Sequence, residues 1–160
     1  MSLEKKVAQL LIQRGKTLSV AESCTGGLLC DRLTNIPGSS HFFKCGIIAY
    51  SNESKKEFLH VPSQFLMKYG AVSPEVVRRM ADSVRKIFKT DFGIGITGIA
   101  GPTGKTPQKP VGLTFIAISA KEKNICKKFI FKGNRLAIKS QAVNEALKTL
   151  LNLIDVTKNS

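Results

Sequence analysis

The sequence has few of the residues from which metal and redox sites are built. It contains no tryptophan, two histidines (His41 and His60) and four cysteines, none of them in C-x-x-C spacing. A zinc site would have to collect ligands scattered along the chain, so we expect neither a metal nor a cofactor. Because nothing indicates secretion, we expect the cysteines to be reduced thiols.

Long hydrophobic runs are also missing. No stretch is apolar over the roughly 20 residues that a membrane-spanning helix needs. Charges interrupt the N-terminal apolar stretch and no small-residue cleavage site follows it, so no signal peptide is predicted. The 160 residues, 42% of them hydrophobic, are typical of one globular domain. We therefore expect a single domain over residues 1–160, located in the cytoplasm and without a membrane partner.

Acidic residues are scarce. The chain has 25 Lys and Arg against 11 Asp and Glu, a formal net charge of +14, which suits a polyanion or a phosphate-bearing small molecule. The excess is densest between Lys121 and Lys139, and a solvated basic face is the favoured interpretation of this segment. A single-stranded nucleic-acid site would place aromatic stacking platforms among these charges. Phe129 and Phe131 alternate there as in a strand, which favours a place in the core.

Helix and strand patterns alternate along the chain. Gly15 ends the first predicted helix, and Ser73-Pro74-Glu75 is a strong helix start. Helices are predicted from Leu3, Leu28, Ser51, Ser73 and Leu136, and strands over 17–21, 45–50, 92–96, 111–119 and 125–132. This order predicts an α/β fold with a sheet covered on both faces, and a hairpin at 121–124 makes the sheet mixed.

The segment AESCTGG, residues 21–27, is the first candidate for chemistry. Ser23 follows a predicted buried strand and precedes Gly-Gly and a helix, a position that suits either a nucleophile or an ordinary helix cap. Both interpretations stay open on the pattern alone. Cys24 is a rival nucleophile, but we favour a structural role, with its side chain on the opposite side of the turn from Ser23.

A serine nucleophile needs a base, and neither histidine lies at a glycine-rich turn. Lysine can serve if its pKa falls well below about 10.4. Lys55, in YSNESK after the second predicted strand, is the best-placed candidate. The alternative is that Lys55 is an ordinary lysine on the solvent-exposed side of a helix.

A second glycine-rich loop, ITGIAGPTGKTPQKPVG, begins at the end of the third predicted strand. It nearly matches a phosphate-binding P-loop but has five residues where that motif has four, and prolines follow where a helix is required. We therefore reject a nucleoside-triphosphatase. Thr97 and Gly98 remain candidates as a hydroxyl and a backbone N–H at a strand end.

Taken together, the motifs resemble the C-terminal domain of the competence/damage-inducible protein A (CinA) family, whose characterised activity is nicotinamide-nucleotide amidase. The resemblance covers nearly the whole chain. It is carried by AESCTGG, PGSS at 37–40, IIAYSN at 47–52, GAVS at 70–73, TGIAGP at 97–102 and KPVG at 109–112.

The resemblance implies a three-layer α/β/α sandwich with a mixed, mostly parallel sheet of five or six strands. It also implies hydrolysis of nicotinamide mononucleotide, a phosphorylated pyridine nucleotide, to nicotinic acid mononucleotide and ammonia. The catalytic residues would be Ser23 as nucleophile, Lys55 as base and Thr97. The expected substrate-binding residues are Thr25, Gly26, Gly27, Tyr50, Gly98 and Arg135.

The sequence departs from the family pattern at Cys45, His60 and Asn134, which we expect to border the pocket, so that the departures bear on the fine-tuning for the substrate more than on the chemistry. Relatives favour a homodimer or another homo-oligomer. Two alternatives to the enzyme remain, a nucleic-acid-binding module and a non-catalytic scaffold. The first is suggested by the charge and by the family's competence label.

Overall fold

The structure is a computed structural model that describes residues 1–156. Residues 157–160, the last four of the predicted domain, lie outside the described residues. The helices are α1 (Leu3–Gln13), α2 (Leu28–Thr34), α3 (Asn52–Leu59), α4 (Ser63–Tyr69), α5 (Pro74–Phe88) and α6 (Arg135–Val156), with a short 3-10 turn, η1 (Ser39–His41). The strands are β1 (Leu18–Glu22), β2 (Phe43–Ile48), β3 (Phe92–Gly98), β4 (Leu113–Ala120) and β5 (Asn124–Ile130).

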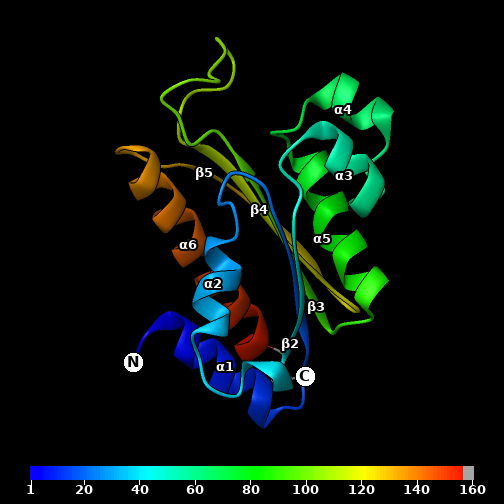
Figure 1. Cartoon of the computed structure of the whole chain (residues 1–160), viewed down its shortest axis with the longest axis vertical. Helices are drawn as coiled ribbons and strands as arrows, with labels where there is room; N and C mark the ends of the chain where they lie inside the picture. Colours follow the sequence, from blue (N-terminus) through cyan, green and yellow to red (C-terminus); the bar gives the residue numbers. More distant parts are fainter. Residues whose placement is uncertain (157–160) are drawn as a thin grey trace.

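These strands form one sheet in the order β2-β1-β3-β4-β5. β1 pairs in parallel with β2 and β3, whereas β4 runs antiparallel to both of its neighbours. Helices α1, α2 and α6 cover one face of the sheet, and α3, α4 and α5 lie on the other (Figure 1). The predicted three-layer α/β/α architecture and mixed sheet are confirmed.

The two faces of β3 explain how the layers pack. Ile94 and Ile96 point into the core shared with α6. Alternating with them along the strand, Gly93 and Gly95 lie under α5, where a Cβ on Gly93 would come within 2.2 Å of the Ala81 carbonyl oxygen. Because successive residues of a strand point to opposite faces of the sheet, the isoleucines pack in the core on one face. On the other face, the glycines allow the backbone of α5 to approach the strand closely.

The strand limits differ from the predicted ranges by one or two residues, and one helix was not predicted. β2 begins and ends two residues before the predicted strand over 45–50, and directly after it the carbonyl groups of Ala49 and Tyr50 accept hydrogen bonds from the Lys55 side chain. α4 was not predicted, since it is short and has no side-chain cap at Pro62.

The basic segment near the C-terminus forms β5 and the connection to α6. The rings of Phe129 and Phe131 stack on each other with centroids 5.1 Å apart, and both are partly buried against the core. They therefore do not form an exposed platform on which bases could stack. Of the helices in residues 1–156, none is both long enough and apolar enough to cross a membrane.

Candidate active site

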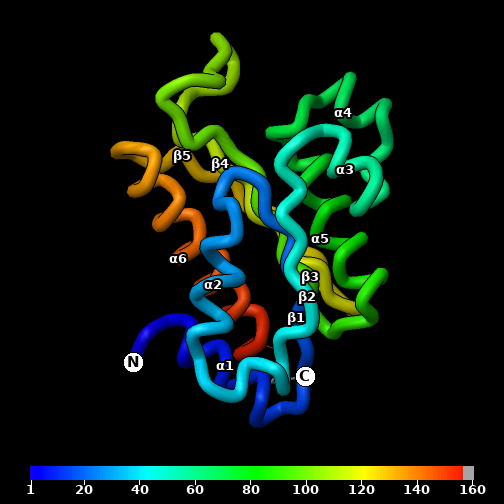
Figure 2. The backbone as a smooth tube through the Cα atoms, in the orientation of Figure 1, coloured from blue at the N-terminus to red at the C-terminus, as the bar shows by residue number. Residues whose placement is uncertain are grey.

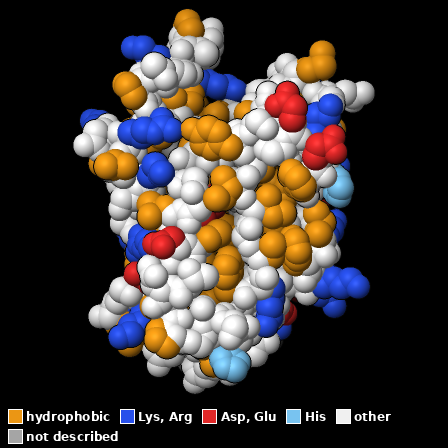
Figure 3. Space-filling model, in the orientation of Figure 1, with side chains coloured by type: hydrophobic (Ala, Val, Ile, Leu, Met, Phe, Trp, Pro, Cys, Tyr) orange, Lys and Arg blue, Asp and Glu red, His pale blue; other side chains and the backbone are white. Residues whose placement is uncertain are grey.

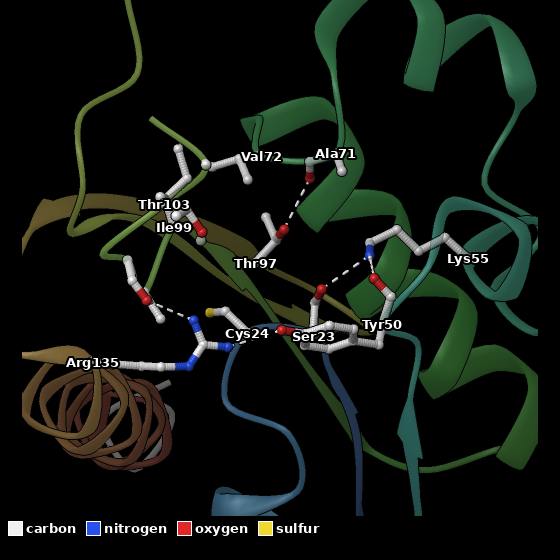
Figure 4. A pocket seen from close by; sticks show the side chains of 14 residues that line it. Ser23, Cys24, Tyr50, Lys55, Ala71, Val72, Thr97, Ile99, Thr103 and Arg135 are labelled. Atoms are coloured by element: carbon white, nitrogen blue, oxygen red, sulfur yellow. Dashed lines mark hydrogen bonds between the residues drawn. The ribbon is translucent and has the colours of Figure 1, made fainter. Parts of the chain in front are cut away.

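The carboxyl ends of the three parallel strands lie at the same edge of the sheet. Figure 2 shows the connections that follow β1, β2 and β3 at one end of the molecule. A cavity of about 320 Å³ opens between them, within the size range of small-molecule sites. It is lined by fourteen residues, of which six were predicted site residues: Ser23, Tyr50, Lys55, Thr97, Gly98 and Arg135 (Figure 4).

Ser23 and Lys55 are in direct contact at one end of this cavity. Lys55 Nζ donates hydrogen bonds to Ser23 Oγ at 2.9 Å, to the Ala49 carbonyl at 2.8 Å and to the Tyr50 carbonyl at 3.3 Å. The Lys55 side chain is only 1% exposed, which excludes the exposed helix lysine considered as its alternative. Ser51 caps the N-terminus of α3 and so fixes the turn from which Lys55 extends.

The environment of Lys55 disfavours its charged form. Burial lowers the pKa of the Lys55 ammonium group, because removal from water penalises the charge. None of the described residues that line the cavity is acidic, so no carboxylate there offsets this effect. A lysine with a lowered pKa beside a serine hydroxyl is an arrangement suited to a general base.

Cys24 occupies a different place from the one expected. It was predicted to point away from Ser23, but it lines the same cavity, because the tight turn brings both side chains to its wall. Burial raises the pKa of the Cys24 thiol to about 11, and the negative charge of Glu22 adds to this effect. The thiol is therefore protonated at neutral pH and is a poor nucleophile there.

Glu22 is a buried acidic residue whose role the sequence analysis missed. Its carboxyl oxygens accept hydrogen bonds from the backbone N–H groups of Gly27 at 3.1 Å, Leu29 at 3.2 Å and Cys30 at 2.8 Å. Glu22 thus holds the start of α2 against the end of β1. An acidic residue directly before a turn and a helix was the available signal, since helix N-termini favour acidic groups.

The groups expected to stabilise an oxyanion are mostly engaged. The Ser23 N–H donates to the Ile96 carbonyl at 3.0 Å, and the Gly26 N–H donates to the Ser23 carbonyl at 3.1 Å. The Thr97 hydroxyl donates to the Ala71 carbonyl at 2.9 Å. The N–H groups of Cys24 and Thr25 donate to no backbone acceptor among residues 1–156.

Three predicted binding residues lie outside the cavity lining. Thr25 is fully buried, and its hydroxyl has no hydrogen-bond partner among the described residues. Gly26 and Gly27 adopt left-handed backbone conformations, with φ of 61° and 98°, that let the chain turn from β1 into α2. Their contribution to binding stays a prediction.

Arg135 lies at the end of the cavity opposite Lys55 (Figure 4). Its guanidinium group donates to the Gly101 carbonyl at 2.7 Å and to the Tyr50 hydroxyl at 2.9 Å. These bonds join the start of α6 to the loop after β3 and to the segment after β2. Arg135 and Lys55 are the basic residues of the cavity wall, and because Lys55 disfavours its charged form, it is the Arg135 guanidinium that makes its end of the cavity favour an anionic ligand.

The three departures from the family pattern do not line the cavity. Cys45 lies within β2, and His60 ends α3 in a left-handed conformation with φ of 52°. Asn134 caps α6, its side-chain oxygen accepting the Ala137 N–H at 2.9 Å. None of the three is therefore a lining residue, although Asn134 directly precedes Arg135, which is one.

Comparison with known proteins bears on the identity of this site. The family model described as the CinA C-terminal domain matches residues 1–154. The chain belongs to this family.

Members of the CinA family resemble the chain in sequence and in structure. The CinA-like protein of Syntrophus aciditrophicus is 49% identical over 150 residues, which cover 93% of this chain and 36% of that protein. The CinA-like protein of Endomicrobium trichonymphae is 46% identical over 149 residues, 93% of this chain and 35% of that protein. The chain thus spans little more than a third of the length of these relatives.

Solved structures extend the agreement to the fold. The competence/damage inducible protein CihA from Agrobacterium tumefaciens has a TM-score of 0.92 at 34% identity, covering 94% of this chain and 93% of that one. The competence damage-inducible protein A from Klebsiella pneumoniae has a TM-score of 0.91 at 32% identity, with the same coverage of both chains. The CinA fold is therefore shared over nearly all of the described residues.

The role of Glu22 in this CinA domain leads to a first prediction. Glu22→Gln replaces an oxygen by an NH₂ group facing backbone N–H donors, so we expect the free energy of unfolding to fall by about 1–3 kcal/mol. Urea unfolding monitored by circular dichroism measures this change. The matched control is Glu57→Gln on the exposed side of α3, expected within about 0.5 kcal/mol of the unaltered protein. Equal effects of the two substitutions would contradict the role assigned to Glu22.

Proposed function

We propose that this chain is an amidohydrolase that converts nicotinamide mononucleotide to nicotinic acid mononucleotide and ammonia. The observation that carries the proposal is the buried Lys55 amine 2.9 Å from the Ser23 hydroxyl, in a cavity whose charged residues are basic. The dyad supplies the chemistry of amide hydrolysis, and the positive charge suits a phosphate-bearing substrate. The particular nucleotide comes from the resemblance to the CinA amidases.

The hydrogen bonds of Lys55 define how the neutral amine would act. A neutral amine has two N–H groups and one lone pair. The N–H groups can donate to the Ala49 and Tyr50 carbonyls, which leaves the lone pair facing the hydroxyl of Ser23. Lys55 then accepts the hydroxyl proton as Ser23 Oγ attacks the carboxamide carbon.

The rest of the reaction returns each group to its starting state. The carbonyl electron pair moves to oxygen in the tetrahedral intermediate, where the N–H groups of Cys24 and Thr25, which have no backbone acceptor among residues 1–156, would meet the negative charge. When the C–N bond breaks, Lys55 gives its proton to the departing nitrogen and ammonia leaves. Water then attacks the Ser23 ester, passes a proton to Lys55 and releases the acid, while Ser23 regains its hydroxyl proton.

Arg135 and Tyr50 would bind the remainder of the substrate. The Arg135 guanidinium, at the end of the cavity away from the dyad, is suited to a phosphate group. The Tyr50 side chain, 60% exposed, offers its ring to the pyridine. Thr97, bonded to the Ala71 carbonyl, would shape the wall beside the reacting amide.

Ammonia release tests the reaction and the nucleophile together. Wild type should release ammonia from nicotinamide mononucleotide. Ser23→Ala should fold normally and lose at least about 10³-fold in turnover. Removing one residue from a nucleophile–base pair that acts as a unit lowers turnover by this factor or more. Cys24→Ala should keep most of the activity, since only the backbone of this residue enters the scheme.

A coupled assay for ammonia with both variants measures these turnovers, and circular dichroism checks their folding. Loss of turnover in Cys24→Ala but not in Ser23→Ala would assign the nucleophile to the thiol. No ammonia from folded wild type would favour the binding-module alternative.

The pH dependence follows from the protonation of Lys55. Burial lowers the pKa of Lys55, so the reactive neutral amine becomes populated at a lower pH than for a solvated lysine. We expect kcat/KM to rise with pH up to this lowered pKa and to fall as the pH drops below it, because the ammonium has no lone pair. Initial rates across the pH range give the profile, and Lys56→Gln on the exposed side of α3 is the control that should leave it unchanged. A profile that is flat, or that falls as the pH rises through this range, would oppose a lysine base.

A further inference from the structure

Lys139 lies one turn after Arg135 on α6, so the two side chains leave the same side of the helix. Its amine is 3.6 Å from the position that a Cβ on Gly26 would occupy. Lys139 is half-buried, and over residues 1–156 its amine has neither a hydrogen bond nor an ion pair. Among the described residues, this basic group beside the AESCTGG turn has no acidic partner.

The acidic residue nearest in sequence to this turn does not supply one. The carboxyl oxygens of Glu22 already accept three backbone N–H groups at the start of α2. The positive charge of Lys139 instead acts on Cys24, which lines the cavity. It lowers the pKa of the Cys24 thiol, whereas the larger effect of burial raises this pKa. Lys139 thus adds positive potential near the cavity although its side chain is not part of the lining.

The surface around this position is basic. On the face shown in Figure 3, Lys and Arg side chains gather at the upper left, where Figure 1 places the start of α6 and the loop after β3. Arg135 extends from α6 towards Cys24, so Ser23 and Cys24 lie between Arg135 and Lys55 (Figure 4). The cavity therefore has a reactive end at Lys55 and a cationic end at α6.

We propose that Lys139 and Arg135 together form the subsite for the substrate's phosphate monoester, with Lys139 as the residue that selects phosphorylated over non-phosphorylated ligands. The proposal rests on the proposed function for the identity of the substrate. A dianionic phosphate at the cationic end receives hydrogen bonds from the Arg135 guanidinium and a second, compact positive charge from Lys139. Gly26, which has no side chain, leaves open the space between the turn and the Lys139 amine.

Ribose 5-phosphate is the probe that tests this subsite, because it carries the phosphate monoester but has no amide. Titration calorimetry should show binding to wild type, and Lys139→Gln should weaken it at least about tenfold, the loss expected for one hydrogen bond to a charged group. Lys148→Gln is the matched control on the same helix. Nine residues further along, at about 100° per residue, Lys148 lies on the opposite side of α6 and pairs with Glu145.

Each outcome decides the proposal. Selective weakening in Lys139→Gln, with Lys148→Gln unchanged, supports the subsite even if no ammonia is released from nicotinamide mononucleotide. Equal affinity of all three proteins would overturn the role of Lys139, and so would equal weakening by both substitutions. If ribose 5-phosphate does not bind to wild type, the proposed subsite is wrong. The amidase activity is tested separately by the ammonia assay.

Discussion

The hydrogen bond between Lys55 Nζ and Ser23 Oγ depends on the parallel pairing of β1 with β2. The two residues are 32 positions apart in the chain and belong to the segments that follow these strands. The pairing places Glu22 opposite Ile48, and the Ala49 N–H continues the ladder by donating to the Glu22 carbonyl at 2.8 Å. A shift of this register by one residue would turn the Lys55 helix away from Ser23.

Burying a lysine without a carboxylate partner is costly, and hydrogen bonds to the amine reduce that cost. The amine has three hydrogen-bond partners, two of which are backbone carbonyls at the end of β2. Among the described residues, these carbonyls accept no strand-pairing hydrogen bond, so the backbone directly after the edge strand β2 binds the amine. The same arrangement that lowers stability also lowers the pKa of Lys55, which is what a lysine base requires.

Sequence patterns predicted the layers of the fold but not the contacts across the site. Helical periodicity, the start at Ser73-Pro74-Glu75 and the alternation of strands each depend on local chemistry, and they led to the correct α/β architecture. Local patterns could not decide whether Ser23 is a helix cap or a nucleophile. That depends on which side chains lie beside it in space, and these come from distant parts of the sequence. In the structure Glu22 caps α2, so the hydroxyl of Ser23 is left for Lys55.

Two further features could not be read from local patterns. The position of Cys24 depends on the turn formed by Gly26 and Gly27, whose left-handed conformations are not specified by the spacing of the glycines. Lys139 was counted only as part of a basic stretch, because its neighbour Gly26 lies more than a hundred residues earlier in the chain. In both cases the missing information was the packing of α2 and α6 on the same face of the sheet.

The most direct test of the account is to identify the residue that carries the acyl group during turnover. The protein would be mixed with nicotinamide mononucleotide, quenched in acid after milliseconds and digested, and the peptide that carries the added mass would be sequenced by mass spectrometry. The account predicts the acyl group on Ser23, as an ester that disappears in Ser23→Ala. An acyl group on Cys24, or turnover without any acylated residue at every quench time, would contradict the Ser23–Lys55 mechanism.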